Sequence, residues 1–175
     1  MGKAQQQAVM ERLQLRTYRA EDQPDVRRLY EVGRLAGHVP PNDSTADLDQ
    51  VEHTYLCDER VHFWVAEYEG RVVGMVGVTA ADRDRALVRR LRVDPAMRGQ
   101  GVAFKLMEAA LAFCRKHAYL KVIFDTHMEG DREAKEVFDR FAFQHNRNRM
   151  VDGKEVQEFY LDLYREPRDE KEKKE

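Results

Sequence analysis

The sequence predicts one α/β domain, built from strands and helices in the order β-α-α-β-β-β-α-β-α-β-β. Three observations lead to this fold class. Short segments with apolar residues at every second position indicate half-buried strands. A longer segment after Gly101 carries apolar residues at helical spacing and indicates an amphipathic helix. The length of 175 residues lies within the usual range for one domain with a substantial core.

The first elements are read from alternation and from helix-start signals. Residues 13–18 alternate as a strand does, and the acids and proline of 21–24 begin a short helix that ends at Gly33. The paired prolines of 37–43 predict a loop. Ser44 or Thr45 is then expected to cap a second helix, which runs to about Cys57.

The middle of the chain reads as consecutive strands. Residues 61–68 are apolar at both odd and even positions, apart from His62 and Glu67, which favours a strand covered on two faces. A hairpin turn at 69–70 leads into a strand over 71–79. In that strand Gly74 and Gly77 predict a bulge or the close approach of a ligand.

The second half begins with a strand at 87–93, followed by the helix after Gly101. Alternation and turn signals predict the remaining elements as a strand at 122–124, a helix from 130 to 141, a strand from Phe143, a turn at 152–153 and a strand at 159–163. We expect a polar leader at 1–12, one domain at 13–164 and a charged, solvated tail at 165–175.

Composition and charge bear on location and partners. The net charge of −2 gives no argument for binding to nucleic acid or to a membrane. No apolar run approaches the about 20 residues that span a bilayer, and 1–12 does not resemble a signal peptide. Cys57 and Cys114 are too few and too far apart for a zinc site or a disulfide framework. We therefore expect a cytoplasmic protein without a metal.

The most informative stretch is 87–103, which reads as a strand, a sharp turn and the start of a helix. Gly99 and Gly101 stand where that helix begins, and Arg98 precedes them. The first N–H groups of a helix have no internal partner and lie at the positive end of its dipole. Glycines at this place predict an anion held by backbone N–H groups.

Two common phosphate motifs do not fit this stretch. A nucleotide-binding P-loop needs Lys followed by Ser or Thr, a pair that the chain lacks. A dinucleotide fingerprint needs a small residue three positions after Gly101, where Phe104 stands. The pattern Arg98-x-x-Gly101-x-Ala103 instead resembles the Arg/Gln-x-x-Gly-x-Gly/Ala motif of the GNAT superfamily, the acetyl-CoA-dependent N-acetyltransferases.

The predicted element order resembles the GNAT layout over about residues 13–164. The resemblance implies a mixed, mostly antiparallel sheet of six to seven strands flanked by about four helices. It also implies that the fourth and fifth strands splay apart and hold acetyl-CoA, the co-substrate, between them. The cofactor-binding residues that it implies are Leu91, Arg92, Val93, Arg98, Gly99, Gln100, Gly101, Val102, Ala103, Thr126 and Phe138.

The resemblance also assigns roles in acetyl transfer. The donor to the developing oxyanion maps to the backbone N–H of Leu91 or Val93, whose backbone groups would also pair with the pantetheine amides. The family often carries a Tyr that protonates the thiolate, in the pattern Asn-x-x-Ala-x-x-x-Tyr-x-x-x-Gly-Phe. This chain has Phe138 at that position, so either the thiolate leaves unassisted or another side chain supplies the proton.

Several groups are candidates for the general base. The strand at 86–93 carries no acid or histidine, so the base must come from elsewhere. Glu67 interrupts an apolar strand, and His127 follows the fifth strand with a side chain whose pKa suits proton transfer at neutral pH. Glu67 also reads as a strand-end surface charge and His127 as a loop residue. Weaker candidates are Asp82, Asp84, Asp125 and a chain of water molecules.

Charged clusters suggest what the acceptor is. Alternation sends Arg89 and Arg90 to opposite faces of their strand without interleaved aromatic residues, so we expect no nucleic-acid partner. Clustered acids either attract a cationic amine or form an exposed acidic helix face. These acids are Asp43, Asp47, Asp49 and Glu52.

We therefore expect an N-acetyltransferase that moves acetyl from acetyl-CoA to a primary amine, on a small molecule or a peptide, by direct attack in a ternary complex. Homodimer formation is one expectation for its assembly. The missing tyrosine leaves a second reading open, a non-catalytic module of the same fold that senses acyl-CoA. A third reading is an interaction protein whose cleft stays empty.

Overall fold

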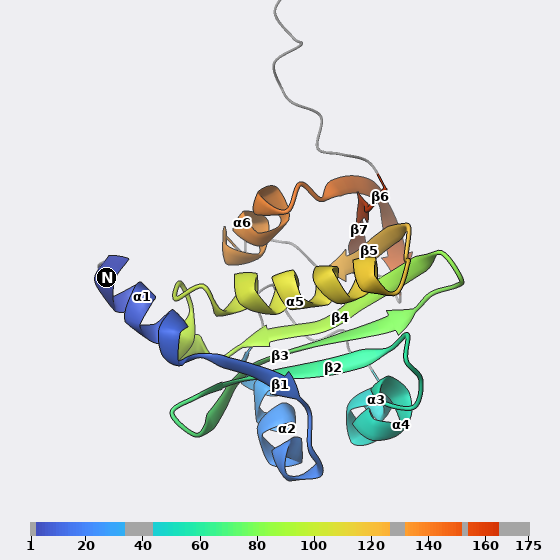
Figure 1. Ribbon diagram of the computed structural model, residues 1–175. Helices are drawn as coiled ribbons and strands as arrows, with labels where there is room; N and C mark the ends of the chain where they lie inside the picture. The colour runs from blue at the N-terminus through green and yellow to red at the C-terminus, as the bar shows by residue number, and fades with distance from the viewer. Residues whose placement is uncertain (1–2, 34–43, 127–131, 152–153, 165–175) are drawn as a thin grey trace, which may run out of the picture.

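A seven-stranded sheet in the spatial order β1-β2-β3-β4-β5-β7-β6 forms the centre of the molecule (Figure 1). The computed structural model describes residues 3–33, 44–126, 132–151 and 154–164. β4 and β5 pair in parallel, whereas the other neighbouring strands pair antiparallel. The sheet is thus mixed and mostly antiparallel, as the resemblance implied. The strands are β1 (Gln14–Thr17), β2 (His62–Tyr68), β3 (Arg71–Ala80), β4 (Arg85–Val93), β5 (Lys121–Thr126), β6 (Gln144–Val151) and β7 (Lys154–Asp162).

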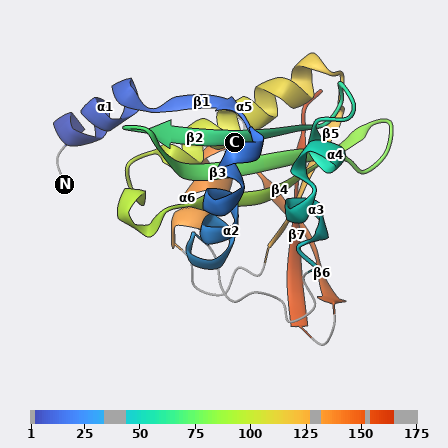
Figure 2. The same ribbon diagram turned by 90° about the horizontal axis from the view of Figure 1, so that it is seen from below.

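Helices cover both faces of this sheet (Figures 1 and 2). α5 and α6 pack on one face over the larger buried cluster, and α2, α3 and α4 pack on the other face over a second cluster. The α-helices are α1 (Lys3–Arg12), α2 (Gln23–Val32), α3 (Ala46–Asp49), α4 (Val51–Tyr55), α5 (Val102–Lys116) and α6 (Arg132–Arg140). Short 3-10 helices precede α2 and α5, at Ala20–Asp22 and Pro95–Met97. None of the described helices is long and apolar enough to cross a membrane.

Two segments differ from the expected secondary structure. Residues 3–12, expected as part of a loose leader, form α1, in which Val9 is buried and Met10 packs against the larger cluster. The helix expected from about 44 to 57 is divided into α3 and α4, because Gln50 leaves the helical region with φ −135° and ψ 52°. These changes give more helices than the four that were expected.

Gly74 and Gly77 of β3 let helices approach the sheet closely from both sides. A Cβ on Gly74 would lie 2.9 Å from Leu106 Cδ1 of α5, and one on Gly77 would lie 2.6 Å from Tyr55 Cε1 of α4. The bulge expected in this strand is present beside Gly74, because Gly74 pairs with Ala66 of β2 and Val72 pairs with Glu67, which leaves one extra residue in β3. The close approach at these glycines is therefore made by side chains of the protein itself.

A half-buried group of rings lies between β2 and the end of α5. The ring of His62 lies 4.3 Å from that of Trp64 and 5.6 Å from that of Phe113, and Phe113 lies 4.2 Å from His117. Burial, together with the nearby charge of His117, lowers the pKa of His62 below its usual value. The protonated form of His62 is thus disfavoured in the folded chain.

This lowered pKa predicts a stability that depends on pH. Below about pH 6.5, the ordinary pKa of histidine, His62 binds a proton in the unfolded chain but stays neutral in the folded chain. The free energy of unfolding should therefore fall as the pH drops below about 6.5, until the folded pKa is reached. Urea denaturation of wild type and His62→Gln at pH 8, 6.5 and 5.5 measures the difference. His53→Gln, at an exposed histidine of α4, is the control and should keep the wild-type slope. Parallel curves for wild type and His62→Gln would contradict the assignment.

Candidate active site

The turn before α5 adopts the backbone geometry that an anion site requires. Gly99 has φ +70°, and Gly101, the residue that caps the N-terminus of α5, has φ +90°. Both values lie in the left-handed region, which glycine enters at little cost. A Cβ on Gly99 would meet nothing within 4 Å, so the turn is open on that side. The first N–H groups of α5, at Val102 and Ala103, lie directly behind it.

The turn is fixed to the rest of the fold by Asp94. Its side chain accepts a hydrogen bond from the Ala96 N–H at 3.0 Å and another from Arg28 of α2 at 2.7 Å. Burial would raise the pKa of Asp94, but these hydrogen bonds and the nearby arginines outweigh it and lower that pKa. The carboxylate thus stays charged and holds the approach to α5 in place.

A cleft of about 290 Å³ lies beside the turn, between α1, α5 and α6. Lys105 of α5 donates to the backbone carbonyls of Met10 and Leu13, at 3.4 and 3.0 Å, and so fastens the end of α1 to α5. The cleft is lined by Gln6, Met10, Gly101, Phe104, Lys105 and Arg140, among others. α1 therefore forms one wall of the space next to Gly101.

β4 and β5 separate as the resemblance implied. Their parallel pairing runs from Arg85 and Lys121 to Val88 and Phe124 and ends there, although β4 continues to Val93. Beyond that point β4 contains Arg90, whose φ of +59° is left-handed. β4 has a bulge here, because Arg89 pairs with Gly77 of β3 and Arg92 pairs with Met75, which leaves one extra residue in β4. The bulge breaks the alternation of side chains along the strand.

Beyond this bulge, the two candidate donors to a ligand on the backbone of β4 are the N–H groups of Leu91 and Val93. The N–H of Val93 donates to the Gly33 carbonyl, at the end of α2, over 2.9 Å. That amide already has a partner, which leaves Leu91 as the candidate oxyanion donor on this strand. The side chain of Arg92 donates to the Leu91 carbonyl and lies over the ring of Tyr30, on the face that α2 covers.

A buried ion pair on that same face corrects two expectations. Arg90 donates to both carboxylate oxygens of Asp47, at 2.9 and 2.6 Å, and Arg89 lies 3.9 Å from the same group. The two arginines therefore share a face, because the left-handed Arg90 reverses the alternation that would have separated them. Asp47 is not part of an exposed acidic face, since 9% of its side chain is exposed.

A tyrosine completes this ion pair. Tyr55, which is fully buried, donates its hydroxyl hydrogen to Asp47 Oδ2 at 2.6 Å. Burial alone would raise the pKa of Asp47, yet the hydrogen bonds from Arg90 and Tyr55 outweigh burial and lower it. Burial, with the charge of Asp47 beside it, raises the pKa of Tyr55 well above its usual value. The group is thus an ionised carboxylate held by a guanidinium and a neutral phenol.

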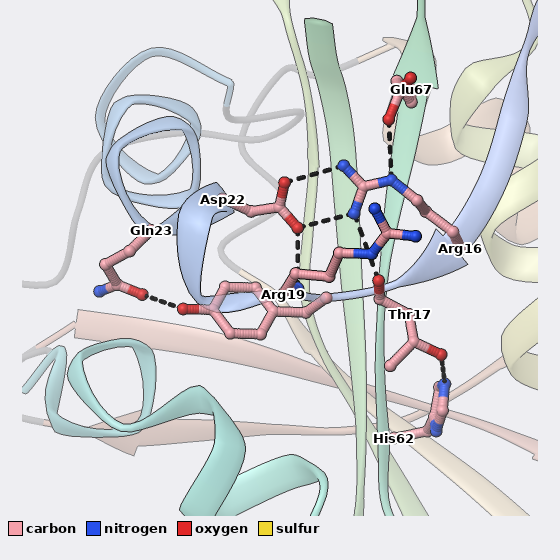
Figure 3. A network of polar contacts seen from close by, with 8 residues as sticks. Arg16, Thr17, Arg19, Asp22, Gln23, His62 and Glu67 are labelled. Atoms are coloured by element: carbon pink, nitrogen blue, oxygen red, sulfur yellow. Dashed lines mark hydrogen bonds and ion pairs between the residues drawn. The ribbon is translucent and has the colours of Figure 1, made fainter. Parts of the chain in front are cut away.

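Glu67 lies on β2, two strands away from β4, in a different network of charges (Figure 3). Arg16 of β1 donates from Nε to Glu67 at 2.8 Å, and its other nitrogens bind both oxygens of Asp22 at 2.8 Å. Asp22 also accepts from the Arg19 N–H. The structure therefore gives Glu67 a partner on β1 and does not bring it together with Leu91 or Gly101.

The remaining candidate residues lie beside or beyond β5. Phe138 of α6 is buried in an aromatic cluster, stacked on Phe159 at 4.6 Å and edge-on to Phe124 at 5.0 Å. Thr126 is the last residue of β5, where its backbone pairs with Gln157. His127 lies outside the described residues. Phe138 thus packs in the core at the position where the family pattern often has its tyrosine.

Sequence reasoning missed three contributors to this region. Gly33, α1 and the contact of Asp47 with Arg90 were not expected, although Asp47 itself was a candidate for attracting the acceptor. Asp47 and Arg90 lie 43 positions apart, so the spacing of charges along the chain gives no sign of their contact. The Gly-x-Gly pattern was the available signal, and it predicted only the turn before α5.

Comparison with known proteins identifies relatives. The model of the acetyltransferase (GNAT) family matches residues 26–143. Human N-acetyltransferase 8 is 39% identical over 85 residues, which cover 46% of this chain and 37% of that protein. Human N-acetylaspartate synthetase is 35% identical over 81 residues, which cover 46% of this chain and 27% of that protein. The chain therefore spans less than half of the length of these curated relatives.

Solved structures share the fold. A spermidine N-acetyltransferase from Vibrio cholerae, in complex with CoA and spermine, superimposes with a TM-score of 0.66. The match covers 86% of this chain and 95% of the other, at 17% sequence identity. At this identity the likeness concerns the arrangement of the sheet and helices.

Proposed function

The chain belongs to the acetyltransferase (GNAT) family, and from this premise we propose that it transfers acetyl from acetyl-CoA to a primary amine by direct attack in a ternary complex. One observation carries the proposal. The left-handed Gly101 begins α5, and β4, which leads to it, continues to Val93 after its pairing with β5 has ended at Val88. An anion-binding helix start and a gap between parallel strands together suit a long ligand with a diphosphate in its middle.

The coenzyme would lie along residues already described. Its diphosphate would rest against the turn from Arg98 to Gly101 and against the N–H groups of Val102 and Ala103. The open side of Gly99 leaves room for the phosphates. Leu91 and the end of β5 at Thr126 would flank the pantetheine arm between the separated strands.

The chain then has three tasks in the reaction. It holds the amine nitrogen against the thioester carbon, so that a C–N bond forms as the C–S bond breaks. The Leu91 N–H stabilises the negative charge that develops on the thioester oxygen. A base takes the proton that the amine loses. The sulfur leaves as a thiolate, which takes a proton from water because Phe138 has none to give.

We propose His127 as the base, since it directly follows Thr126, the last residue of β5, in the sequence. The ion pair of Glu67 with Arg16 supports a structural role for that carboxylate. His127→Ala should lower turnover mainly below about pH 8, where an imidazole is a much better proton acceptor than bulk water. His53→Ala, at an exposed histidine, is the matched control. A pH profile of turnover that is unchanged in His127→Ala would remove this histidine from the mechanism.

The alternative, an acyl-CoA sensor of the same fold, is favoured by one observation, the phenylalanine at position 138. Titration calorimetry with acetyl-CoA and release of free thiol on a broad panel of amines separate the two. Binding followed by thiol release supports the transferase. Binding without release on any amine supports the sensor, and no heat of binding contradicts both.

The acceptor and the compartment remain proposals. One relative is named for the synthesis of N-acetylaspartate, and one structural neighbour was solved with spermine. These names suggest acceptors of opposite charge. We propose a cytoplasmic location, in which Cys57 and Cys114, both free thiols, would stay reduced.

A further inference from the structure

Arg89 of β4 lies next to the buried pair of Arg90 and Asp47. It directly follows Val88, the last residue of β4 that pairs with β5. Its side chain points to the face that α3 covers, since its guanidinium lies 3.9 Å from Asp47 of that helix. Since α3 and α5 cover opposite faces of the sheet (Figure 1), Arg89 stands at the start of the gap between the two strands, on the face opposite α5.

Asp47 does not satisfy this guanidinium. Both of its oxygens accept short hydrogen bonds from Arg90, and Oδ2 also accepts from the Tyr55 hydroxyl. Among the described residues, the 3.9 Å contact with Asp47 is the ion-pair contact of Arg89, and it is too long for a hydrogen bond. The Arg89 side chain is 36% exposed, whereas that of Arg90 is 5% exposed. Arg90 thus serves the fold, and Arg89 keeps its donors available on the solvent side.

Two further guanidinium groups of β4 lie on this face. Those of Arg90 and Arg92 lie over the ring of Tyr30, at 5.4 and 5.7 Å from its centre. Among the described residues, Asp47 is the carboxylate that contacts both Arg89 and Arg90, and its oxygens already accept hydrogen bonds from Arg90 and Tyr55. The exposed guanidinium of Arg89 repels a cation and attracts an anion.

We propose that the acceptor is an amine that carries a carboxylate, as an amino acid does, and that Arg89 binds this carboxylate. The inference rests on the proposed function and adds the class of acceptor. A guanidinium presents a planar fork of N–H donors that matches a carboxylate. The fork holds the acid end of the acceptor and leaves its amine to face the thioester. Amines without an acid group, polyamines above all, are poor acceptors.

Matched acceptors test the proposal on the full chain. Thiol release from acetyl-CoA is measured with the standard L-amino acids, with their C-terminal amides and with spermidine. At least one acid should be acetylated with a kcat/KM at least 10-fold above that of its amide and of spermidine. Amides or spermidine used as well as every acid would overturn the inference and leave the proposed transferase standing.

Variants assign the effect to Arg89. Arg89→Gln should raise KM for the preferred acid about 10- to 100-fold, as expected for the loss of a hydrogen bond to a charged group. Its affinity for acetyl-CoA should not change, and Arg89→Lys should recover part of the loss. Arg27→Gln, at an exposed arginine of α2 that pairs with Asp49, is the control and should keep the wild-type KM. An Arg89→Gln enzyme with the wild-type KM would contradict the assignment.

A binding measurement keeps the test decisive if no amine is acetylated. N-acetylglycine and N-acetylglycinamide differ at the acid group and mimic the product. With CoA present, the acid should raise the melting temperature more than the amide does, and Arg89→Gln should abolish the difference. Equal shifts, or no shift with either compound, would overturn the inference. Absence of thiol release alone would count against the transferase.

Discussion

Replacing Gly101 with aspartate should abolish measurable binding of acetyl-CoA. The new carboxylate would stand where α5 begins, next to the proposed diphosphate and within reach of Met10 and Gln6 of α1. At an effective dielectric constant of about 20, two unit charges about 4 Å apart repel by about 4 kcal/mol. This energy corresponds to a loss of about 1000-fold in affinity. Titration calorimetry should therefore detect no heat of binding with Gly101→Asp.

Gly70 provides a matched control for this substitution. It has φ +76° and lies in the turn between β2 and β3, where a Cβ would meet nothing within 4 Å. Aspartate at either glycine introduces the same left-handed strain, roughly 1 to 2 kcal/mol, and the same charge. Gly70→Asp should lose that stability and keep full affinity for acetyl-CoA. Wild-type affinity in Gly101→Asp, or an equal loss in both variants, would contradict the proposed position of the diphosphate.

Asp47→Asn should lower the free energy of unfolding by about 3 to 5 kcal/mol. Removal of the carboxylate leaves the buried Arg90 without its ion pair to Asp47, which costs far more than the pair itself contributes. The double variant Asp47→Asn, Arg90→Met should be less destabilised than Asp47→Asn alone, because no buried charge then remains. Urea denaturation measures both. Asp49→Asn, which breaks the exposed pair with Arg27, is the control and should change stability by about 0 to 1 kcal/mol.

The lowered pKa of Asp47 gives this prediction a dependence on pH. Its ion pair contributes fully above about 3.9, the ordinary pKa of aspartate, because the carboxylate is then charged in both states. The contribution is lost as the pH falls from about 3.9 through the lower pKa of the folded state. Wild type and Asp47→Asn should thus differ most near pH 7 and converge in acid. A constant difference down to pH 3 would contradict the ion pair as its source.

The sequence allowed the prediction of those features that depend on local patterns. Strand alternation and helical spacing placed most of the elements, and the Gly-x-Gly pattern located the turn before α5. The position of the β4 bulge was not predictable, because it depends on how the strand pairs with β3. One left-handed residue, Arg90, then invalidated the alternation argument for Arg89. α1 was missed for another reason, since its polar surface gives no apolar stripe to read.

The contacts of the charged candidate residues could not be predicted from local sequence patterns either. Asp47 looked like one of several surface acids until α3 placed it against Arg90. Glu67 looked like a candidate base because an acid in an apolar strand is unusual, and its partner Arg16 lies 51 positions earlier. Burial of a charge follows from long-range packing, which a count of residues along the chain does not contain.

The fastening of α1 to α5 means that the opening beside Gly101 is assembled from segments that lie 92 to 95 positions apart in the chain. Lys105 joins them by donating hydrogen bonds to the carbonyl oxygens of Met10, in the last turn of α1, and Leu13, just beyond it. A chain shortened at its beginning would keep its whole sheet and still lose a wall of that opening.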